Sequence, residues 1–137
     1  MVNLKITTAL FTVLLLFSCS HKSETETLFS HADTLIEEYP DSALQSLDLS
    51  TEEIEGLSDK ECARYALLLA RATDKCKLSL LPCDSLLNVA LDYYDDDEKE
   101  KAIALLYKGR LAVEMEEAEE ATTCFQKGLT IIQDFPK

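Results

Sequence analysis

The stretch AIALLYKGRLAVEMEEAEEATTCFQKGLTIIQDFP, residues 102–136, decides the fold of this chain. Its apolar and small residues recur at every third or fourth position, which is the spacing of one face of an α-helix. Pro136 indicates where the second of two helices stops. We therefore predict two antiparallel helices that pack through two stripes: Ala102, Leu105, Leu106, Gly109, Ala112 and Val113 on the first, and Ala118, Ala121, Thr122, Phe125, Gly128, Leu129 and Ile132 on the second.

The upstream sequence carries further helix signals. The whole chain has only three glycines and three prolines, and alternation of β-branched residues is almost absent. Ser50 with Glu53, and Ser58 with Glu61, have the spacing of a capping box, in which each side chain satisfies the other residue's backbone N–H. The second box predicts a long helix that ends near Lys75.

Two aspartates and one serine predict further helix starts. A helix is expected from about Ser23 to Pro40, and Asp41 is placed to cap the next one. Asp84 follows the loop that contains Pro82 and is expected to cap a helix in the same way. These signals together predict an all-α fold.

The last helix pair resembles the tetratricopeptide repeat (TPR), a helix-turn-helix unit of about 34 residues. Gly109 falls where that family has its first-helix glycine. Ala121, Phe125 and Gly128 fall at the small, aromatic and small residues of the family's second helix. The resemblance implies a protein-binding module, because repeats of this kind present a concave groove to a peptide or protein segment.

Two more degenerate helix pairs precede this unit, over about residues 24–49 and 58–95. The resemblance thus implies a TPR-like α-solenoid of about three antiparallel helix pairs, which is roughly the number that a stable array needs. No polar capping helix is evident after Pro136. The uncapped C-terminal pair is therefore expected to associate with a second copy, to dock a partner, or to continue into a longer array.

The N-terminus has the composition of an export leader. Lys5 supplies a basic start, and the apolar run Ile6–Phe17 follows it. A helix needs about 20 apolar residues to span a membrane, and this run is shorter. A removable leader is therefore favoured over a permanent anchor.

Leu16 and Ser18, which precede Cys19, resemble the lipobox of bacterial lipoproteins. The resemblance implies that residues 1–18 are a signal peptide cleaved before Cys19. It also implies a lipid thioether on Cys19 and an acyl chain, such as palmitate, on the new amino group. Anchoring by several chains is firm, because each buried CH₂ contributes about 0.8 kcal/mol. The expected location is the bacterial cell envelope, with the lipid anchored at the periplasmic face or in the outer membrane.

After the cysteine, residues 19–27 are polar and are predicted to form a tether, with the helical repeat domain over residues 28–137. Two alternatives to lipidation stay open. Ordinary cleavage, for instance after Ser20, would give a free secreted protein. A cytosolic protein with an apolar N-terminal helix is the other alternative.

The charge balance excludes one class of partner. The chain has 26 acidic and 13 basic residues and a net charge of −13. Nucleic-acid binding relies on lysine and arginine displacing counterions from phosphates, so no nucleic-acid partner is expected. An acidic surface of this kind also keeps a domain soluble.

Four cysteines besides Cys19 give an even number in an exported protein. Cys76 and Cys83 are the best candidate disulfide, because Pro82 implies a bend between them, and free cysteines are the alternative. No metal or cofactor is expected, since metal-ligand spacings are missing. The acidic run Asp95–Glu98 lacks the glycine and distal glutamate of a calcium loop.

The leading functional hypothesis is a membrane-anchored scaffold that binds an unidentified protein or peptide. An alternative is the sensor or regulatory part of a longer envelope signalling protein. No enzymatic activity is expected, because nucleophile–histidine arrangements and phosphate-binding loops are missing from the sequence. Six residues are predicted to line the binding groove: Arg64, Tyr65, Arg71, Tyr107, Lys108 and Arg110. The alternatives are half-buried packing for Tyr65 and Tyr107 and solvated helix ends for Lys108 and Arg110.

Overall fold

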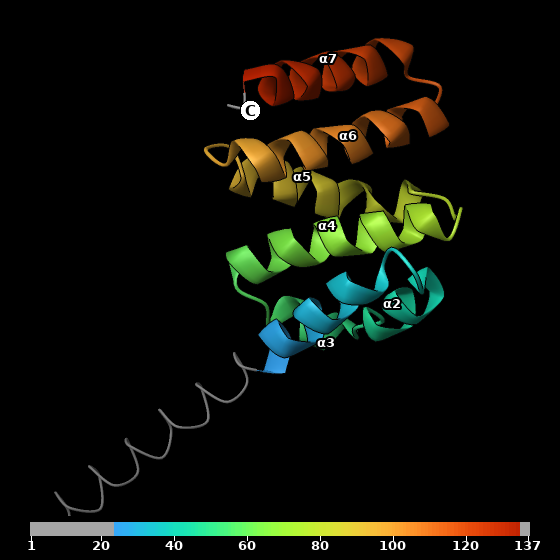
Figure 1. Cartoon of the computed structure of the whole chain (residues 1–137), viewed down its shortest axis with the longest axis vertical. Coiled ribbons are helices and arrows are strands. Elements are labelled where there is room, and N and C mark those ends of the chain that lie inside the picture. The colour runs from blue at the N-terminus through green and yellow to red at the C-terminus, as the bar shows by residue number, and fades with distance from the viewer. Residues whose placement is uncertain (1–23, 135–137) are drawn as a thin grey trace, which may run out of the picture.

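The computed structural model describes residues 24–134, and every regular element among them is a helix (Figure 1). The predicted all-α class is therefore confirmed. The predictions about the signal peptide and Cys19 lie outside the described residues. Residues 24–27, which were predicted to be part of the tether, belong to a helix in which Thr25 is buried, and the rest of the predicted tether lies outside the described residues.

The helices follow one another with short connections. In chain order they are a helix over residues 24–35, α2 (Pro40–Ser46), α3 (Thr51–Glu55), α4 (Asp59–Lys75), the short 3₁₀ helix η1 (Leu81–Cys83), α5 (Asp84–Tyr93), α6 (Glu98–Glu114) and α7 (Ala118–Asp134).

Both predicted capping boxes are confirmed. The Ser50 hydroxyl accepts a hydrogen bond from the Glu53 backbone N–H. In return, the Glu53 carboxylate accepts from the Ser50 backbone N–H at 2.8 Å, and this box opens α3. Ser58 and Glu61 form the same reciprocal pair at the start of α4, which ends at Lys75 as predicted. These motifs involve residues three positions apart, so the local sequence determines them.

Two predicted caps are wrong. Pro40 occupies the first position of α2 instead of ending the preceding helix, so Tyr39 is the N-cap and Asp41 lies inside the first turn. Proline suits this place because its missing N–H has no helical partner there. At α5, η1 runs directly into the helix, so Cys83 is the N-cap and Asp84 lies in the first turn.

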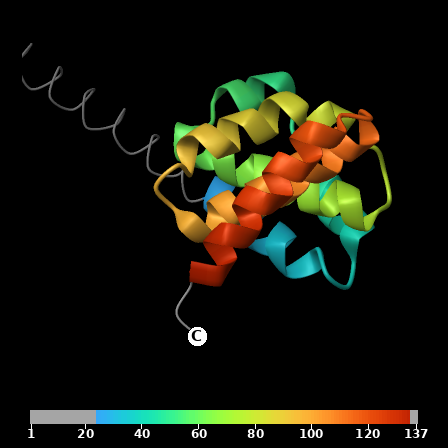
Figure 2. The same cartoon turned by 90° about the horizontal axis from the view of Figure 1, so that it is seen from above.

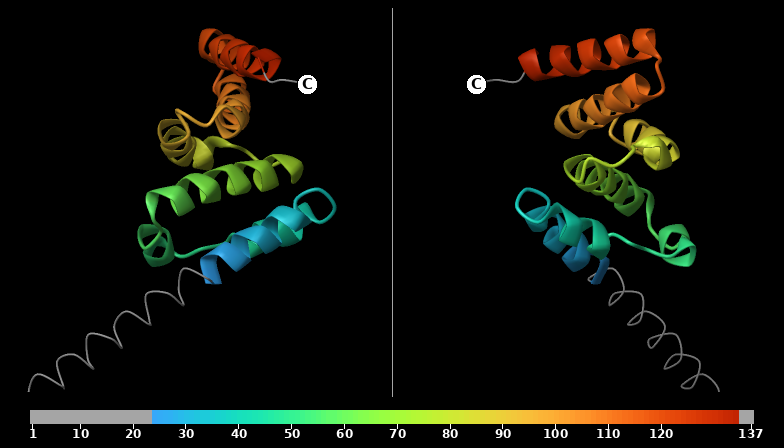
Figure 3. Two further views of the ribbon diagram at one scale, coloured as in Figure 1. Left: turned by 60° about the vertical axis from the view of Figure 1, so that its left-hand side comes forward. Right: turned by 90° about the vertical axis from the view of Figure 1, so that its right-hand side faces the viewer.

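The helices stack as three successive pairs, with residues 24–35 at one end and α7 at the other (Figures 1 and 3). The pairs are the helix over residues 24–35 with α2, α4 with α5, and α6 with α7. Viewed from above, α7 lies over α6, and no described element covers α7 (Figure 2).

Two clusters of buried apolar side chains hold the stack together, and α4 contributes to both. Tyr65, Leu68 and Ala72 of α4 pack against Phe29 and its neighbours in the first pair. The opposite side of α4 packs with α5 and α6. This second cluster consists of Ala66, Leu67, Ala70, Leu80, Cys83, Leu87, Ala90, Ala104, Tyr107 and Leu111.

Candidate binding grooves

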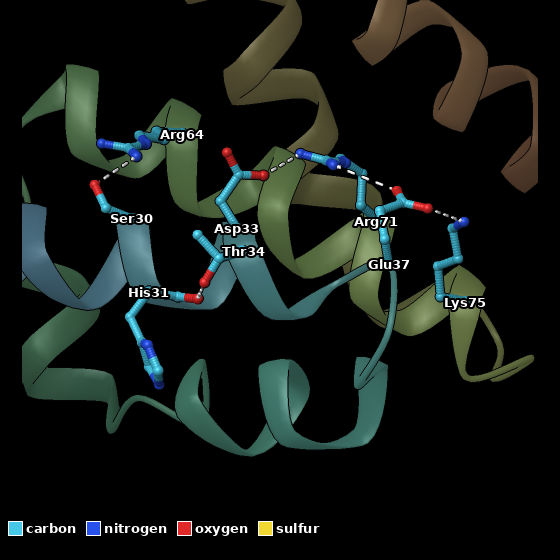
Figure 4. A network of polar contacts seen from close by, with 8 residues as sticks. All are labelled: Ser30, His31, Asp33, Thr34, Glu37, Arg64, Arg71 and Lys75. Atoms are coloured by element: carbon cyan, nitrogen blue, oxygen red, sulfur yellow. Dashed lines mark hydrogen bonds and ion pairs between the residues drawn. The ribbon is translucent and has the colours of Figure 1, made fainter.

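The first helix and α4 are joined by a ladder of ion pairs. Arg64 contacts Glu26, Arg71 contacts Asp33 at 2.6 Å, and Lys75 contacts Glu37 at 2.5 Å. Figure 4 shows the second and third of these pairs side by side. The partners are 38 residues apart in each case. A constant separation requires that the two helices run parallel and in register.

The ladder is exposed, and its main effect is on register. The Lys75 ammonium lowers the pKa of Glu37, and the Glu37 carboxylate raises the pKa of Lys75. Ion pairs of this kind contribute little to stability because water screens them. Arg64 is more constrained, since its guanidinium also lies 5.9 Å from the centre of the Phe29 ring.

A groove of about 520 Å³ lies on the side where the first helices of the three pairs meet. We call it the inner groove. It combines aliphatic and aromatic side chains with guanidinium, ammonium and carboxylate groups. Its lining residues are Asp33, Arg64, Leu67, Leu68, Arg71, Tyr94, Lys99, Glu100, Ile103, Leu106 and Tyr107.

Three of the six predicted binding residues, namely Arg64, Arg71 and Tyr107, meet in the inner groove. Each arginine uses part of its hydrogen-bonding capacity on the first helix. Arg64 donates to Glu26. Figure 4 shows that Arg64 also donates to Ser30 and that Arg71 donates to Asp33. A guanidinium has five N–H donors, so both retain donors for a ligand.

The other three predicted residues do not line the inner groove. Tyr65 is buried in the first cluster, where its hydroxyl donates to the Leu47 carbonyl at 3.1 Å. Lys108 forms an ion pair with Asp84 at 2.5 Å. Arg110 pairs with Asp74 of α4 at 2.5 Å. These residues hold helices together and are not gathered at a ligand site.

Tyr94, at the end of α5, lines the inner groove although the sequence did not single it out. Burial raises its pKa to about 12, with the nearby Glu100 carboxylate as a smaller cause. Like that of an ordinary tyrosine, its hydroxyl is protonated near neutral pH and can donate a hydrogen bond. Tyr94 packs edge to face against the Tyr93 ring, at 5.1 Å between centroids.

A second groove, of about 650 Å³, lies between α6 and α7 at the end of the stack. We call it the end groove. Its lining is apolar except for the Lys99 ammonium. The lining residues are Lys99, Ala102, Ile103, Leu106, Cys124, Phe125, Gly128, Leu129 and Ile132.

The end groove corrects the predicted packing of α7. Phe125, Leu129 and Ile132 were expected to be buried against α6, but they are 38%, 56% and 58% exposed. The small residues of α7 face α6 instead, namely Ala121, Cys124 and Gly128. Because α7 has a packed neighbour on one side only, Leu129 and Ile132 remain on the open side, whereas the ring of Phe125, although partly exposed, lies over Gly109 of α6. The predicted stripe of α6 is likewise corrected at Leu106 and Val113, which are both exposed.

The two grooves adjoin along α6. Lys99, Ile103 and Leu106 line both of them and follow helical spacing on one side of α6. Lys99 and Ile103 were not selected from the sequence, and the stripe that they form with Leu106 is the signal that could have revealed them. Within residues 24–134, Lys99 takes part in none of the ion pairs found.

The candidate disulfide is not formed in this structure, where both thiols are free. The Cys76 thiol donates to Asp41 at 3.4 Å, whereas Cys83 is buried in the second cluster, where burial raises the pKa of its thiol. Cys62 and Cys124 are also free. Among the described residues, no group of three or more potential ligands is placed to hold a metal ion.

None of the helices in the described part of the chain is both long and apolar enough to cross a membrane. Comparison with protein-family models, with curated proteins and with solved structures gives no match for this chain.

Proposed function

We propose that this protein is a lipid-anchored, TPR-like scaffold of the bacterial cell envelope that binds a segment of another protein in its inner groove. The observation that carries the proposal is the gathering of Arg64, Arg71 and Tyr107 with Tyr94 in that groove. Tyrosine and arginine are the residues that most often supply binding energy at protein interfaces.

The groove's composition specifies the segment that fits it. Leu67, Ile103 and Leu106 offer an apolar floor, which favours an aliphatic or aromatic side chain on the ligand. Arg71 and Lys99 favour a carboxylate on the same segment, because charge-assisted hydrogen bonds are stronger than neutral ones. The ligand is therefore expected to carry an acidic and an apolar side chain close together.

Membrane attachment through Cys19 is the second part of the proposal. It is supported by the leader-like run Ile6–Phe17 and by the lipobox-like Leu16 and Ser18 before the cysteine. Attachment would keep the scaffold at the membrane surface, where it meets envelope proteins in two dimensions.

Site-specific photo-crosslinking tests the binding site. A benzophenone amino acid at Glu100, in the inner groove, should give a defined adduct with another protein in intact cells. The same amino acid at Val89, which is exposed on α5 and lines neither groove, is the matched control. Identical adducts at both positions, or no adduct at Glu100, would contradict the proposal.

A further inference from the structure

The second and third helix pairs repeat one another residue by residue. The backbone turns sharply after α4 at Lys77 and after α6 at Glu116, both with positive φ. Each turn is closed by a bond spanning five residues, from Leu78 N to the Thr73 carbonyl and from Glu117 N to the Ala112 carbonyl. Each residue of the second turn lies 39 positions after its counterpart in the first turn.

This correspondence extends to the second helices, with a shift of 38 positions. Cys83, Leu87 and Ala90 of α5 belong to the second cluster, with Leu86, Leu91 and Tyr94 packed against it. Their counterparts are all on α7, and five of the six line the end groove: Ala121, Phe125 and Gly128, with Cys124, Leu129 and Ile132. The end groove is therefore the third pair's version of the place where α6 packs on the second pair.

Side chains that a following helix covers in the first two pairs are buried, whereas their counterparts in the third pair are exposed. Phe29 and Ala32 of the first pair are fully buried under α4, and Leu67 of the second pair is 5% exposed under α6. The matching Leu106 of the third pair is 46% exposed. Likewise Leu87 is fully buried, whereas its counterpart Phe125 is 38% exposed.

The helices that fill the first two positions show what an occupant must look like. α4 inserts Tyr65, Leu68 and Ala72 into the first cluster, and α6 inserts Ala104, Tyr107 and Leu111 into the second. Both sets have the same spacing, an apolar residue followed by others three and seven positions later. Each of these helices runs parallel to the first helix of the preceding pair, so an occupant should run parallel to α6.

A second copy of this chain does not fit that description. The corresponding residues of its first helix are Thr27, Ser30 and Thr34, which are polar and exposed, so head-to-tail stacking would bury no apolar face. Face-to-face pairing would bring two identical linings together, and the only charged group in each is the Lys99 ammonium. The facing linings of the face-to-face arrangement supply no carboxylate to Lys99.

We infer that the end groove receives an amphipathic helix from a partner protein, with apolar residues at the first, fourth and eighth positions of its inner face. That helix lies parallel to α6 and places a carboxylate of its first turn near Lys99. Acidic residues are favoured in a first helical turn in any case. This site shares Lys99, Ile103 and Leu106 with the inner groove, whereas its lining on α7 belongs to the end groove alone.

A synthetic peptide with the sequence of α6, Glu98–Glu114, is the probe that the chain itself provides. It carries the required apolar spacing and acidic residues in its first turn. Fluorescently labelled peptide is titrated into the full chain in lipid nanodiscs, and binding is followed by fluorescence anisotropy. A second peptide with Tyr107→Glu and Leu111→Glu is the control for the inner face.

The protein variants are Leu129→Glu and Ile132→Glu in the end groove, with Val89→Glu on α5 as the matched surface control. The native peptide should bind, and each end-groove variant should weaken it by about tenfold or more, because burying an unpaired carboxylate is costly. Val89→Glu and the wild type should bind equally. Lys99→Glu should weaken binding by a factor that shrinks as salt is added.

Three results would overturn the inference. The first is that the native peptide does not bind at concentrations of about 1 mM, which corresponds to a binding free energy of roughly −4 kcal/mol. The second is that the wild type and both end-groove variants bind the peptide equally, and the third is that the chain forms a dimer that Leu129→Glu abolishes. The last would make a second copy the occupant. Leu129 does not line the inner groove, so none of these results decides whether crosslinking from Glu100 succeeds.

Discussion

Replacing Gly109 by alanine should destabilise the protein, although alanine is normally the better helix residue. A Cβ at position 109 would lie 2.5 Å, 2.7 Å and 3.0 Å from three carbon atoms of the Phe125 ring. Real contacts of this kind are longer, so the ring or the helix must move. The close approach of α6 and α7 at this point therefore depends on the missing side chain.

Two opposing effects set the size of the change. Alanine is favoured over glycine in a helix interior by about 0.5–1 kcal/mol. Overpacking of a fitted contact costs about 1–3 kcal/mol, and the contact is tight here because three ring atoms are involved. We expect the overpacking to win, with a net loss of about 1 kcal/mol in the free energy of unfolding.

Removing the Phe125 ring should reverse the sign of the effect that Gly109→Ala has on the free energy of unfolding. Phe125→Ala alone should cost about 2–3 kcal/mol, less than the 3–5 kcal/mol of a buried ring, because the ring is 38% exposed. In that background Gly109→Ala meets no ring, so it should stabilise the protein by about 0.5–1 kcal/mol. The difference between the two backgrounds measures the contact directly.

Urea unfolding followed by far-ultraviolet circular dichroism gives the four free energies of this cycle. The single variants, the double variant and the parent are compared at one temperature and salt concentration. If Gly109→Ala stabilises the parent as much as it stabilises the Phe125→Ala variant, then the ring does not pack over Gly109, and the packing of α7 on α6 described above is wrong.

Three further predictions concern the helix caps, pH and the membrane anchor. Ser58→Ala should lower the free energy of unfolding by about 1 kcal/mol, whereas Ser46→Ala, at a half-buried position in α2 that caps no helix, should have a smaller effect in the same urea assay. The pKa of Glu114 is held below its ordinary value of 4.5, chiefly by the Ser79 hydroxyl and then by the backbone N–H of Leu80. Its contribution to stability is therefore present above about pH 4.5 and lost as the pH falls through the lowered pKa, so Glu114→Gln should flatten the acid limb of stability against pH. Cys19→Ser should move the protein from membrane to soluble fractions, and continued sedimentation with membranes would rule out lipid as the anchor.

The helix boundaries were largely predictable because their determinants are local. The Ser58–Glu61 box and the end of α4 at Lys75 depend on residues a few positions apart. The wrong assignment at Asp41 arose from competition at one place, where Pro40 can either end one helix or begin the next. The local sequence permits both roles of Pro40, and the packing of the first helix pair decides between them.

The candidate site was harder to predict because α4 and α6 are buried on two sides. On such a helix most positions face a neighbour, so apolar spacing does not tell which face meets which partner. Tyr65 and Arg64 are adjacent in sequence, yet the first lies in the core and the second lines the inner groove. The placement of these side chains depends on how three helix pairs stack, which involves residues far apart in the chain.

The two ends of the stack differ in a way that gives the molecule a direction. At the first helix, the positions that could meet a preceding pair are polar, as at Ser30 and Thr34. At α7, the positions that would meet a following helix are the apolar Leu129 and Ile132. Figure 1 shows the first helix and α7 at opposite ends of the stack. A lipid on Cys19, as proposed, would hold the membrane on the side of residue 24, so the apolar end would point away from it. Partner helices would then add only at the end that faces away from the lipid.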